Sequence, residues 1–192
     1  MGWGKMTLLS RILRRVNYIL AICAYKMKFG NRLMLNMNEL PRLSKDVEIR
    51  IIGDSIIKLG KIGAEKNVRF SSVDGGNLSI GNGSSFNTNT LVICYKRIQI
   101  GNNCLFGPNV LIYDHDHIFN EKGIQPGFRF GDVVIEDDCW IGGGTIILRG
   151  THIGAHSVIG AGVVLSGNIP PHSLVKQDRS INITKLVENY DR

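Results

Sequence analysis

Apolar residues recur at every sixth position along the second half of the chain. From Ile135 onward the sequence divides into six-residue lines that each begin with isoleucine or leucine: IEDDCW, IGGGTI, ILRGTH, IGAHSV, IGAGVV and LSGNIP. The fifth residue of the first five lines is small or β-branched, namely Cys139, Thr145, Thr151, Ser157 and Val163. A period of six fits neither an α-helix nor a simple strand. It predicts a regular coil of short strands and turns.

The same spacing is present upstream. It includes Ile62, Val68, Ile80, Phe86 and Val92, with Asp74 as the one polar residue in this register. The pattern then shifts by two residues and resumes as Ile100, Phe106 and Ile112. Three hexapeptides are expected to close one coil of about 18 residues, with the aliphatic side chains along its axis and glycines at its corners.

Three parts of the chain lack this repeat. The first is the segment of residues 1–44, expected to form an N-terminal amphipathic helix and cap before a β-helix over residues 45–170. An extended loop over residues 113–132 interrupts the β-helix, and a long loop inside a regular scaffold is more often functional than accidental. The pair Pro170 and Pro171 is expected to end the repeat, so that residues 171–192 form a C-terminal tail.

The N-terminal segment is predicted to be helical because its apolar residues follow a helical period. They are Leu9, Ile12, Leu13, Val16, Ile19, Leu20 and Cys23, whereas Arg11, Arg14 and Arg15 lie mostly on other faces. The apolar run is shorter than the roughly 20 residues that span a bilayer. The helix is therefore expected to pack on the coil or on a neighbouring subunit, or to lie at a membrane surface.

Composition adds two constraints. Lysine and arginine outnumber aspartate and glutamate by 23 to 16, which gives a net charge of +7 and favours anionic partners such as phosphates, a nucleotide or a membrane surface. The four cysteines, Cys23, Cys94, Cys104 and Cys139, show no C-x-x-C spacing. Free thiols in a reducing cytoplasm are the simplest interpretation.

The repeat resembles that of the hexapeptide-repeat acyltransferases, over about residues 45–170. This resemblance implies an all-β fold, a left-handed parallel β-helix with a short N-terminal helix and an extended loop. It also implies acetyl-CoA as co-substrate, no metal, and a homotrimer whose sites lie between adjacent coils. Within that superfamily the chain resembles bacterial sugar and polysaccharide O-acetyltransferases.

The interrupting loop contains the string YDHDHIFN, and its histidines are the candidate catalytic residues. Acetyl transfer to an alcohol needs a base near neutral pH, and histidine is the natural choice. An ungapped count from the G-P-N-V segment, Gly107 to Val110, places the family's catalytic histidine on His117, whereas a gapped match favours His115. On an extended chain we expect the two imidazoles to point to opposite sides, each beside an aspartate. Asp116 is a candidate substrate-binding residue.

Further candidates come from matching the family's motifs. Asn89 matches the asparagine that holds the acceptor sugar, although a turn corner explains it equally well. Trp140 opens the W-I-G motif and is expected to wall the acceptor or acyl pocket. Gly143 and Ala161 match positions whose backbone N–H groups contact the cofactor. Lys176 and Arg179 are expected either to meet its phosphates or to form a solvated basic tail, since the chain lacks the family's usual G-x-P-A-[KR] segment there.

These features predict an acetyl-CoA-dependent O-acetyltransferase acting on a sugar hydroxyl, in the biosynthesis of a surface polysaccharide such as capsule, O-antigen or exopolysaccharide. The expected location is the cytoplasm or the inner face of the membrane, with no nucleic-acid partner. The alternatives are an N-acetyltransferase of an amino sugar or nucleotide sugar, and a β-helix scaffold without activity. A zinc-dependent carbonic anhydrase on the same coil needs three converging histidines. His152 and His156 fall instead within regular hexapeptides.

Overall fold

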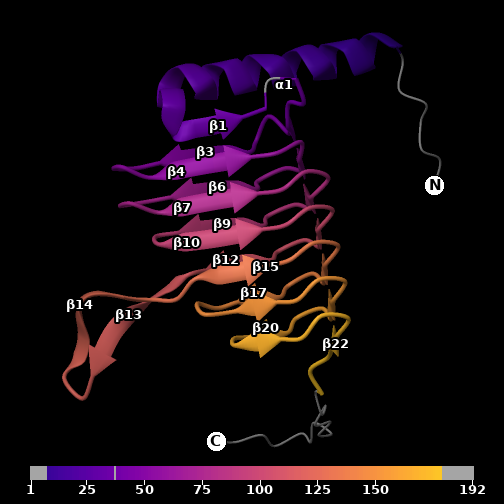
Figure 1. Ribbon diagram of the computed structural model, residues 1–192. Helices are drawn as coiled ribbons and strands as arrows, with labels where there is room; N and C mark the ends of the chain where they lie inside the picture. Colours follow the sequence, from indigo (N-terminus) through magenta and orange to yellow (C-terminus); the bar gives the residue numbers. More distant parts are fainter. Residues whose placement is uncertain (1–7, 37, 179–192) are drawn as a thin grey trace, which may run out of the picture.

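The computed structural model describes residues 8–36 and 38–178, and these form a parallel β-solenoid capped by one helix (Figure 1). Three stacked sheets make its walls. Sheet 1 contains β1 (Leu33–Leu35), β4 (Ile56–Leu59), β7 (Asn77–Ile80), β10 (Arg97–Ile100), β15 (Val133–Ile135), β18 (His152–Ile153) and β21 (Asn168–Ile169). Sheet 2 contains β2 (Arg42–Leu43), β5 (Gly63–Ala64), β8 (Ser85–Phe86), β11 (Leu105–Phe106), β16 (Trp140–Ile141), β19 (Val158–Ile159) and β22 (Leu174–Val175).

Sheet 3 contains β3 (Glu48–Ile51), β6 (Arg69–Ser72), β9 (Leu91–Cys94), β12 (Leu111–Tyr113), β17 (Ile146–Ile147) and β20 (Val164–Leu165). The chain visits the sheets in the order 1, 2, 3, so each coil has three corners, called here corner 1–2, corner 2–3 and corner 3–1. The predicted fold class is confirmed. It follows from the six-residue period, because each hexapeptide supplies one inward aliphatic residue and one turn.

Ladders of apolar side chains fill the axis of the coil. Ile80, Ile100, Ile135 and Ile153 are in register on sheet 1, and Phe86, Phe106, Ile141 and Ile159 on sheet 2. The six inward positions predicted from Ile135 to Leu165 are all buried, as expected. The rings of Phe86 and Phe106 stack with centroids 4.5 Å apart. Burying such residues supplies most of the stabilising free energy of a stack like this one.

The register predicted upstream is wrong at Ile62 and Val68. The pairing places Ala64 opposite Phe86 and Phe70 opposite Val92, so Ile62 and Val68 lie two positions earlier. Both are buried, at the position two residues before the inward residue, which Cys104 and Cys139 occupy in later coils. Asp74 lies at an exposed turn with φ of 48°. The shift arises because β6 and β7 have four residues each, whereas the corresponding strands β17 and β18 of a later coil have two.

The coil begins earlier and ends later than the expected residues 45–170, because β1 and β2 already belong to its sheets and β22 still does. Helix α1 (Leu8–Phe29), followed by the 3₁₀ helix η1 (Gly30–Arg32), covers the N-terminal end (Figure 1). At the other end the repeat continues past Pro170 and Pro171 to β22, which pairs with β19. Pro171 is tolerated because it lies at corner 1–2, against Gly154, where the ladder needs no N–H from it. No helix within the described residues has the length and apolar character that crossing a membrane requires.

The interruption over residues 113–132 is a β-hairpin rather than an irregular loop. Strands β13 (His115–Asn120) and β14 (Gly123–Phe130) pair antiparallel, and the hairpin projects away from the coil at corner 3–1 (Figure 1). Gly123, with φ of 96°, closes its turn in a conformation that favours glycine. The histidine segment therefore lies at the base of the hairpin, next to the wall of the coil, and the tip projects beyond it.

Candidate active site

Asp114 fixes the base of the hairpin. Its side chain is fully buried, and its two oxygens accept backbone N–H groups of Tyr95, Lys96 and Arg97 at 2.7–3.0 Å. Burial, followed by the charge and hydrogen bond of this carboxylate, raises the pKa of the neighbouring Cys94 thiol. Asp114 thus ties the first residues of the hairpin to the β9–β10 turn of the preceding coil. The sequence places Asp114 directly before His115 but does not indicate this role.

His115 is held in one orientation by this carboxylate. Its Nδ1 lies 3.1 Å from Oδ1 of Asp114. The ring lies between Tyr95, at a centroid distance of 4.2 Å, and Phe128, at 5.3 Å, and 14% of the side chain is exposed. A hydrogen bond from Nδ1–H to Asp114 would leave Nε2 as the acceptor nitrogen. The environment therefore defines the orientation of His115 but restricts access to it.

His117 is the accessible histidine of the pair. It is exposed, and its ring contacts Phe128 at 4.8 Å. No hydrogen bond to its ring is found within the described part of the chain. The expectation that the two imidazoles point to opposite sides is wrong, because residues i and i+2 of a strand share one face. Both rings accordingly contact Phe128.

Asp116, the candidate substrate ligand between the histidines, is engaged within the chain. Its Oδ2 accepts a hydrogen bond from Nε of Arg149, which lies at the same corner in the next coil. This ion pair is partly exposed and braces the hairpin against β17. A substrate role for Asp116 stays a prediction, and Arg149 is a contact that no motif in the sequence indicates.

Asn89 lies at corner 2–3, in a ladder of asparagines. Its amide nitrogen donates to Oδ1 of Asn109, and its Oδ1 accepts from the amide of Asn67, both at 3.1 Å. All three residues have φ between 58° and 62°, a conformation that asparagine adopts more readily than most residues. The corner explains the choice of asparagine without a ligand, and acceptor binding by Asn89 stays a prediction.

Gly143 and Ala161 lie at the same corner, in successive coils. The N–H of Gly162 donates to the carbonyl of Gly143 at 2.9 Å, which places the two turns in contact. Within residues 8–36 and 38–178, no hydrogen bond is found for the backbone N–H of Gly143 or of Ala161. Both residues are at least partly exposed. The corner therefore presents two unpaired backbone donors in adjacent coils, as a ligand lying along the coil would need.

Trp140 and Lys176 flank this corner, and both are exposed. Trp140 projects outward from β16 of sheet 2, between Leu105 and Val158 of the adjacent coils. Lys176 follows β22, where the chain turns towards corner 2–3. Arg179 lies outside the described residues. Within one chain, then, four of the candidates gather at corner 2–3: Asn89, Gly143, Ala161 and Lys176.

The histidine hairpin leaves the coil at a different corner. His115 and His117 project from corner 3–1, whereas the unpaired donors of Gly143 and Ala161 lie at corner 2–3, across the width of sheet 3. Figure 1 shows the hairpin extending away from the coil rather than folding back over it. One chain therefore separates the two halves of the predicted site.

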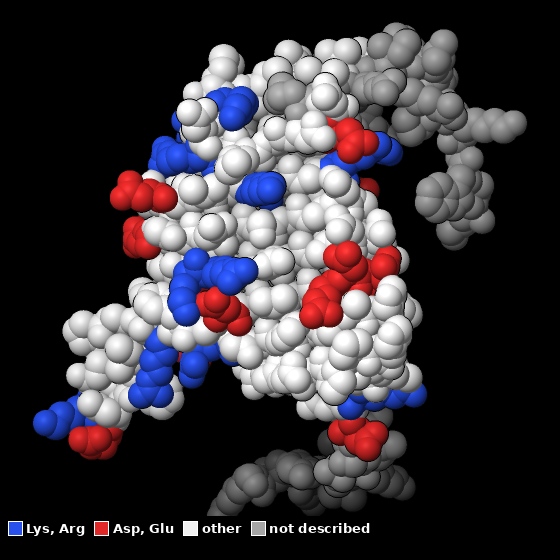
Figure 2. All heavy atoms as spheres, viewed as in Figure 1, with Lys and Arg blue, Asp and Glu red and all other residues white. Residues whose placement is uncertain are grey.

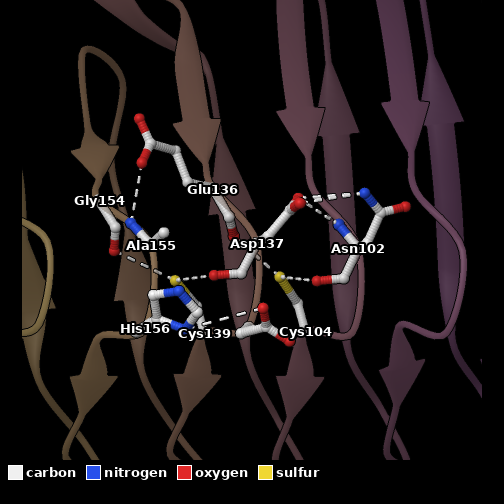
Figure 3. Close-up of polar contacts among 9 residues, drawn as sticks. Asn102, Cys104, Glu136, Asp137, Cys139, Gly154, Ala155 and His156 are labelled. Carbon is white, nitrogen blue, oxygen red and sulfur yellow. Dashed lines mark hydrogen bonds and ion pairs between the residues drawn. The ribbon is translucent and has the colours of Figure 1, made fainter.

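Corner 1–2 carries a third polar cluster (Figure 3). It borders a shallow depression of about 400 Å³ lined by Gln99, Gly101, Val134, Ile135, Glu136, Asp137, Asp138, Ala155 and His156. The N–H of Ala155, followed by the side chain of His152, lowers the pKa of Glu136. Hydrogen bonds from Asn102 lower the pKa of Asp137. The next coil thus satisfies Glu136 and the preceding coil satisfies Asp137. The described residues hold no group of three potential metal ligands.

Two buried thiols lie beneath this corner. Sγ of Cys104 donates to the carbonyl of Glu136 at 3.1 Å, and Sγ of Cys139 to that of Gly154 at 3.3 Å (Figure 3). A hydrogen bond with Cys139, together with burial, raises the pKa of Cys104. Each thiol therefore bridges one coil to the next inside the core, away from the hairpin.

Comparison with known proteins agrees with the repeat pattern. Residues 132–167 match the family described as bacterial transferase hexapeptide (six repeats). The galactoside O-acetyltransferase of Lactococcus lactis is 35% identical over 102 residues, which cover 53% of this chain and 49% of that protein. Nodulation protein L of Rhizobium meliloti is 38% identical over 120 residues, covering 61% and 66%. The chain is a hexapeptide-repeat protein related in sequence to acetyltransferases, and it spans about half the length of the first curated relatives it matches.

Solved structures share the fold. A serine-to-cysteine mutant of AntD, an N-acyltransferase from Bacillus cereus in complex with dTDP-4-amino-4,6-dideoxyglucose and coenzyme A, superposes with a TM-score of 0.58 at 15% identity, covering 85% of this chain and 89% of that one. A Vibrio cholerae hexapeptide-repeat acetyltransferase complexed with acetyl-coenzyme A gives 0.51 at 22% identity, covering 90% and 86%. At these identities the likeness concerns the coil itself.

Proposed function

We propose that the protein is an acetyl-CoA-dependent O-acetyltransferase that acts on a sugar hydroxyl. The observation that carries the proposal is the exposed imidazole of His117, held on a paired hairpin in a chain 35% identical, over 102 residues, to a galactoside O-acetyltransferase. The accessible ring favours His117 over His115, because a base must reach the acceptor hydroxyl. The alternative base is His115, which the Asp114 carboxylate orients.

The proposed chemistry is direct transfer. His117 accepts the proton of the acceptor hydroxyl while its oxygen attacks the thioester carbonyl carbon of acetyl-CoA. The tetrahedral oxyanion would be stabilised by a backbone N–H such as that of Gly143. It collapses with cleavage of the C–S bond, and the CoA thiolate takes up the proton from the imidazolium. Cys94, Cys104 and Cys139 are buried, so none of them is available as an acyl carrier.

We further propose a homotrimer in which the hairpin of one protomer reaches corner 2–3 of its neighbour. Two observations support it. The hairpin and the unpaired donors lie at different corners of one chain. The outward positions of strands that face solvent usually carry polar residues. On sheets 2 and 3 these positions include exposed apolar residues, among them Leu105, Trp140, Val164 and Leu174.

The acceptor is proposed to be a saccharide of a surface polysaccharide, assembled at the cytoplasmic face of a membrane. The buried free thiols favour a reducing compartment. Transfer to an amino group of a sugar or nucleotide sugar is the closest alternative, because a neutral amine makes a similar demand on the base.

The test is consumption of acetyl-CoA against a panel of sugars, amino sugars, nucleotide sugars and saccharide lipids. His117→Ala is expected to lower kcat by roughly 10² to 10⁴ with acetyl-CoA affinity nearly unchanged, because the base acts mainly in the transition state. His115→Ala is expected to lower kcat much less. Reversed effects would identify His115 as the base. Turnover slowed less than about threefold by both substitutions would refute a histidine base.

A further inference from the structure

Helix α1 has one apolar face packed on the coil. Ile22 and Phe29 are buried in the core cluster, and Tyr25 stacks on Phe29 with ring centroids 6.2 Å apart. The hydroxyl of Tyr25 donates to the carbonyl of Val47 at 2.8 Å. These residues are spaced three and four apart, so they form a single stripe that caps the first coil. Capping therefore accounts for one side of α1 only.

A second apolar stripe runs along the outside of the same helix. Its members are spaced alternately three and four apart and all are exposed: Leu13 (54%), Val16 (45%), Leu20 (61%), Cys23 and Met27 (81%). Ile19 borders the stripe and is 46% exposed. Single exposed apolar residues need no explanation, but a continuous stripe over four turns indicates a surface that something else covers. In Figure 1, α1 lies across the N-terminal end of the coil, so this stripe forms the outermost layer of that end.

The charge of the chain is concentrated in this segment. Residues 1–29 contain six basic residues, Lys5, Arg11, Arg14, Arg15, Lys26 and Lys28, and no acidic residue. The other residues contain 17 basic and 16 acidic residues, so the segment carries +6 of the net charge of +7. Over the coil, basic and acidic side chains are interspersed, as Figure 2 shows for one face. A second copy of so basic a helix would repel this one, whereas an anionic surface would attract it.

We propose that α1 docks the protein onto an anionic lipid surface, with the Leu13 to Met27 stripe in the interface and the coil standing away from it. An apolar stripe with basic residues and no acidic ones is the combination that binds such surfaces. The proposal deepens the membrane location suggested for the enzyme and rests on no step of the acetyl transfer. It gives a physical reason for the charge excess and for the exposed stripe together.

The experiment is sedimentation of the full chain with vesicles, at low salt, without acetyl-CoA or acceptor. Vesicles of phosphatidylglycerol and phosphatidylcholine are compared with vesicles of phosphatidylcholine alone. The chain is expected to bind the anionic vesicles and to be released as salt rises. Leu20→Gln is expected to weaken binding about tenfold, from the lost apolar burial. Lys28→Gln should weaken it about fivefold, from the lost charge.

The matched control is Ile56→Gln, an exposed isoleucine on β4 of the coil, which should leave vesicle binding unchanged. Absence of binding to anionic vesicles would overturn the proposal, as would binding that Leu20→Gln leaves intact. A smaller oligomer of Leu20→Gln in size-exclusion chromatography, measured without vesicles, would show instead that the stripe joins copies of this chain. Because the assay contains no substrate, failure here leaves the proposed acetyl transfer to its own test.

Discussion

Replacing Asp114 with asparagine should destabilise the protein far more than the same change two residues along the hairpin. The Asp114 carboxylate is fully buried and accepts three backbone N–H groups besides its contact with His115. Asparagine has one accepting oxygen, and in either orientation its NH₂ group would face the N–H of Tyr95, which both oxygens of Asp114 accept. An unsatisfied buried donor costs about 1–3 kcal/mol, and the hydrogen bonds lost were made to a charged group. We expect Asp114→Asn to cost about 3–5 kcal/mol.

The control is Asp116→Asn, which removes only a partly exposed ion pair with Arg149. It should lower the free energy of unfolding by about 0–1 kcal/mol. Urea unfolding followed by circular dichroism gives both values, provided the slope with denaturant stays constant. Asp114→Asn is expected to lower strongly the urea concentration at which half of the protein is unfolded. If the two variants unfold within about 0.5 kcal/mol of each other, the view that Asp114 anchors the hairpin is refuted.

Two further predictions concern the coil. Ile153→Asp should destabilise by several kcal/mol in a thermal melt, because Ile153 is fully buried and the carboxylate would enter the stack unpaired; an unchanged melting temperature would contradict the ladder. Glu136→Gln should lower the melting temperature slightly near neutral pH, because the lowered pKa of Glu136 gives the ionised form a stabilising role. That difference should shrink as pH falls below the ordinary value of 4.5 and vanish below the lowered pKa, and a difference that grows with acidity would contradict the assignment.

The axis of the coil could be predicted from the sequence because each inward position depends on a local repeat. Ile135 to Leu165 follow one period with no insertion, and all six inward residues are buried. The register of Ile62 and Val68 was predicted wrongly because β6 and β7, between Ala64 and Ile80, have four residues each rather than two. A period of six does not encode these two longer strands.

The candidate site was predictable in its residue types but not in its arrangement. A histidine string at a break in the repeat identified the hairpin, and the glycine-rich motif identified corner 2–3. Neither pattern indicates how many coils and corners separate the hairpin from corner 2–3. Two contacts join residues of different coils. Arg149 bonds to Asp116, and the N–H of Lys96 donates to the buried carboxylate of Asp114. Only the three-dimensional stacking therefore shows that the two halves lie at different corners of one chain.

The most direct test of a site shared between protomers is to mix two inactive variants. His117→Ala removes the proposed base, and Ala161→Trp fills corner 2–3, where the cofactor is proposed to lie. In trimers assembled from equal amounts of both, about a quarter of the sites would combine an intact hairpin with an intact neighbouring corner. We predict recovery of about a quarter of wild-type turnover in the acetyl-CoA assay. Turnover no higher than that of either variant alone would contradict a shared site.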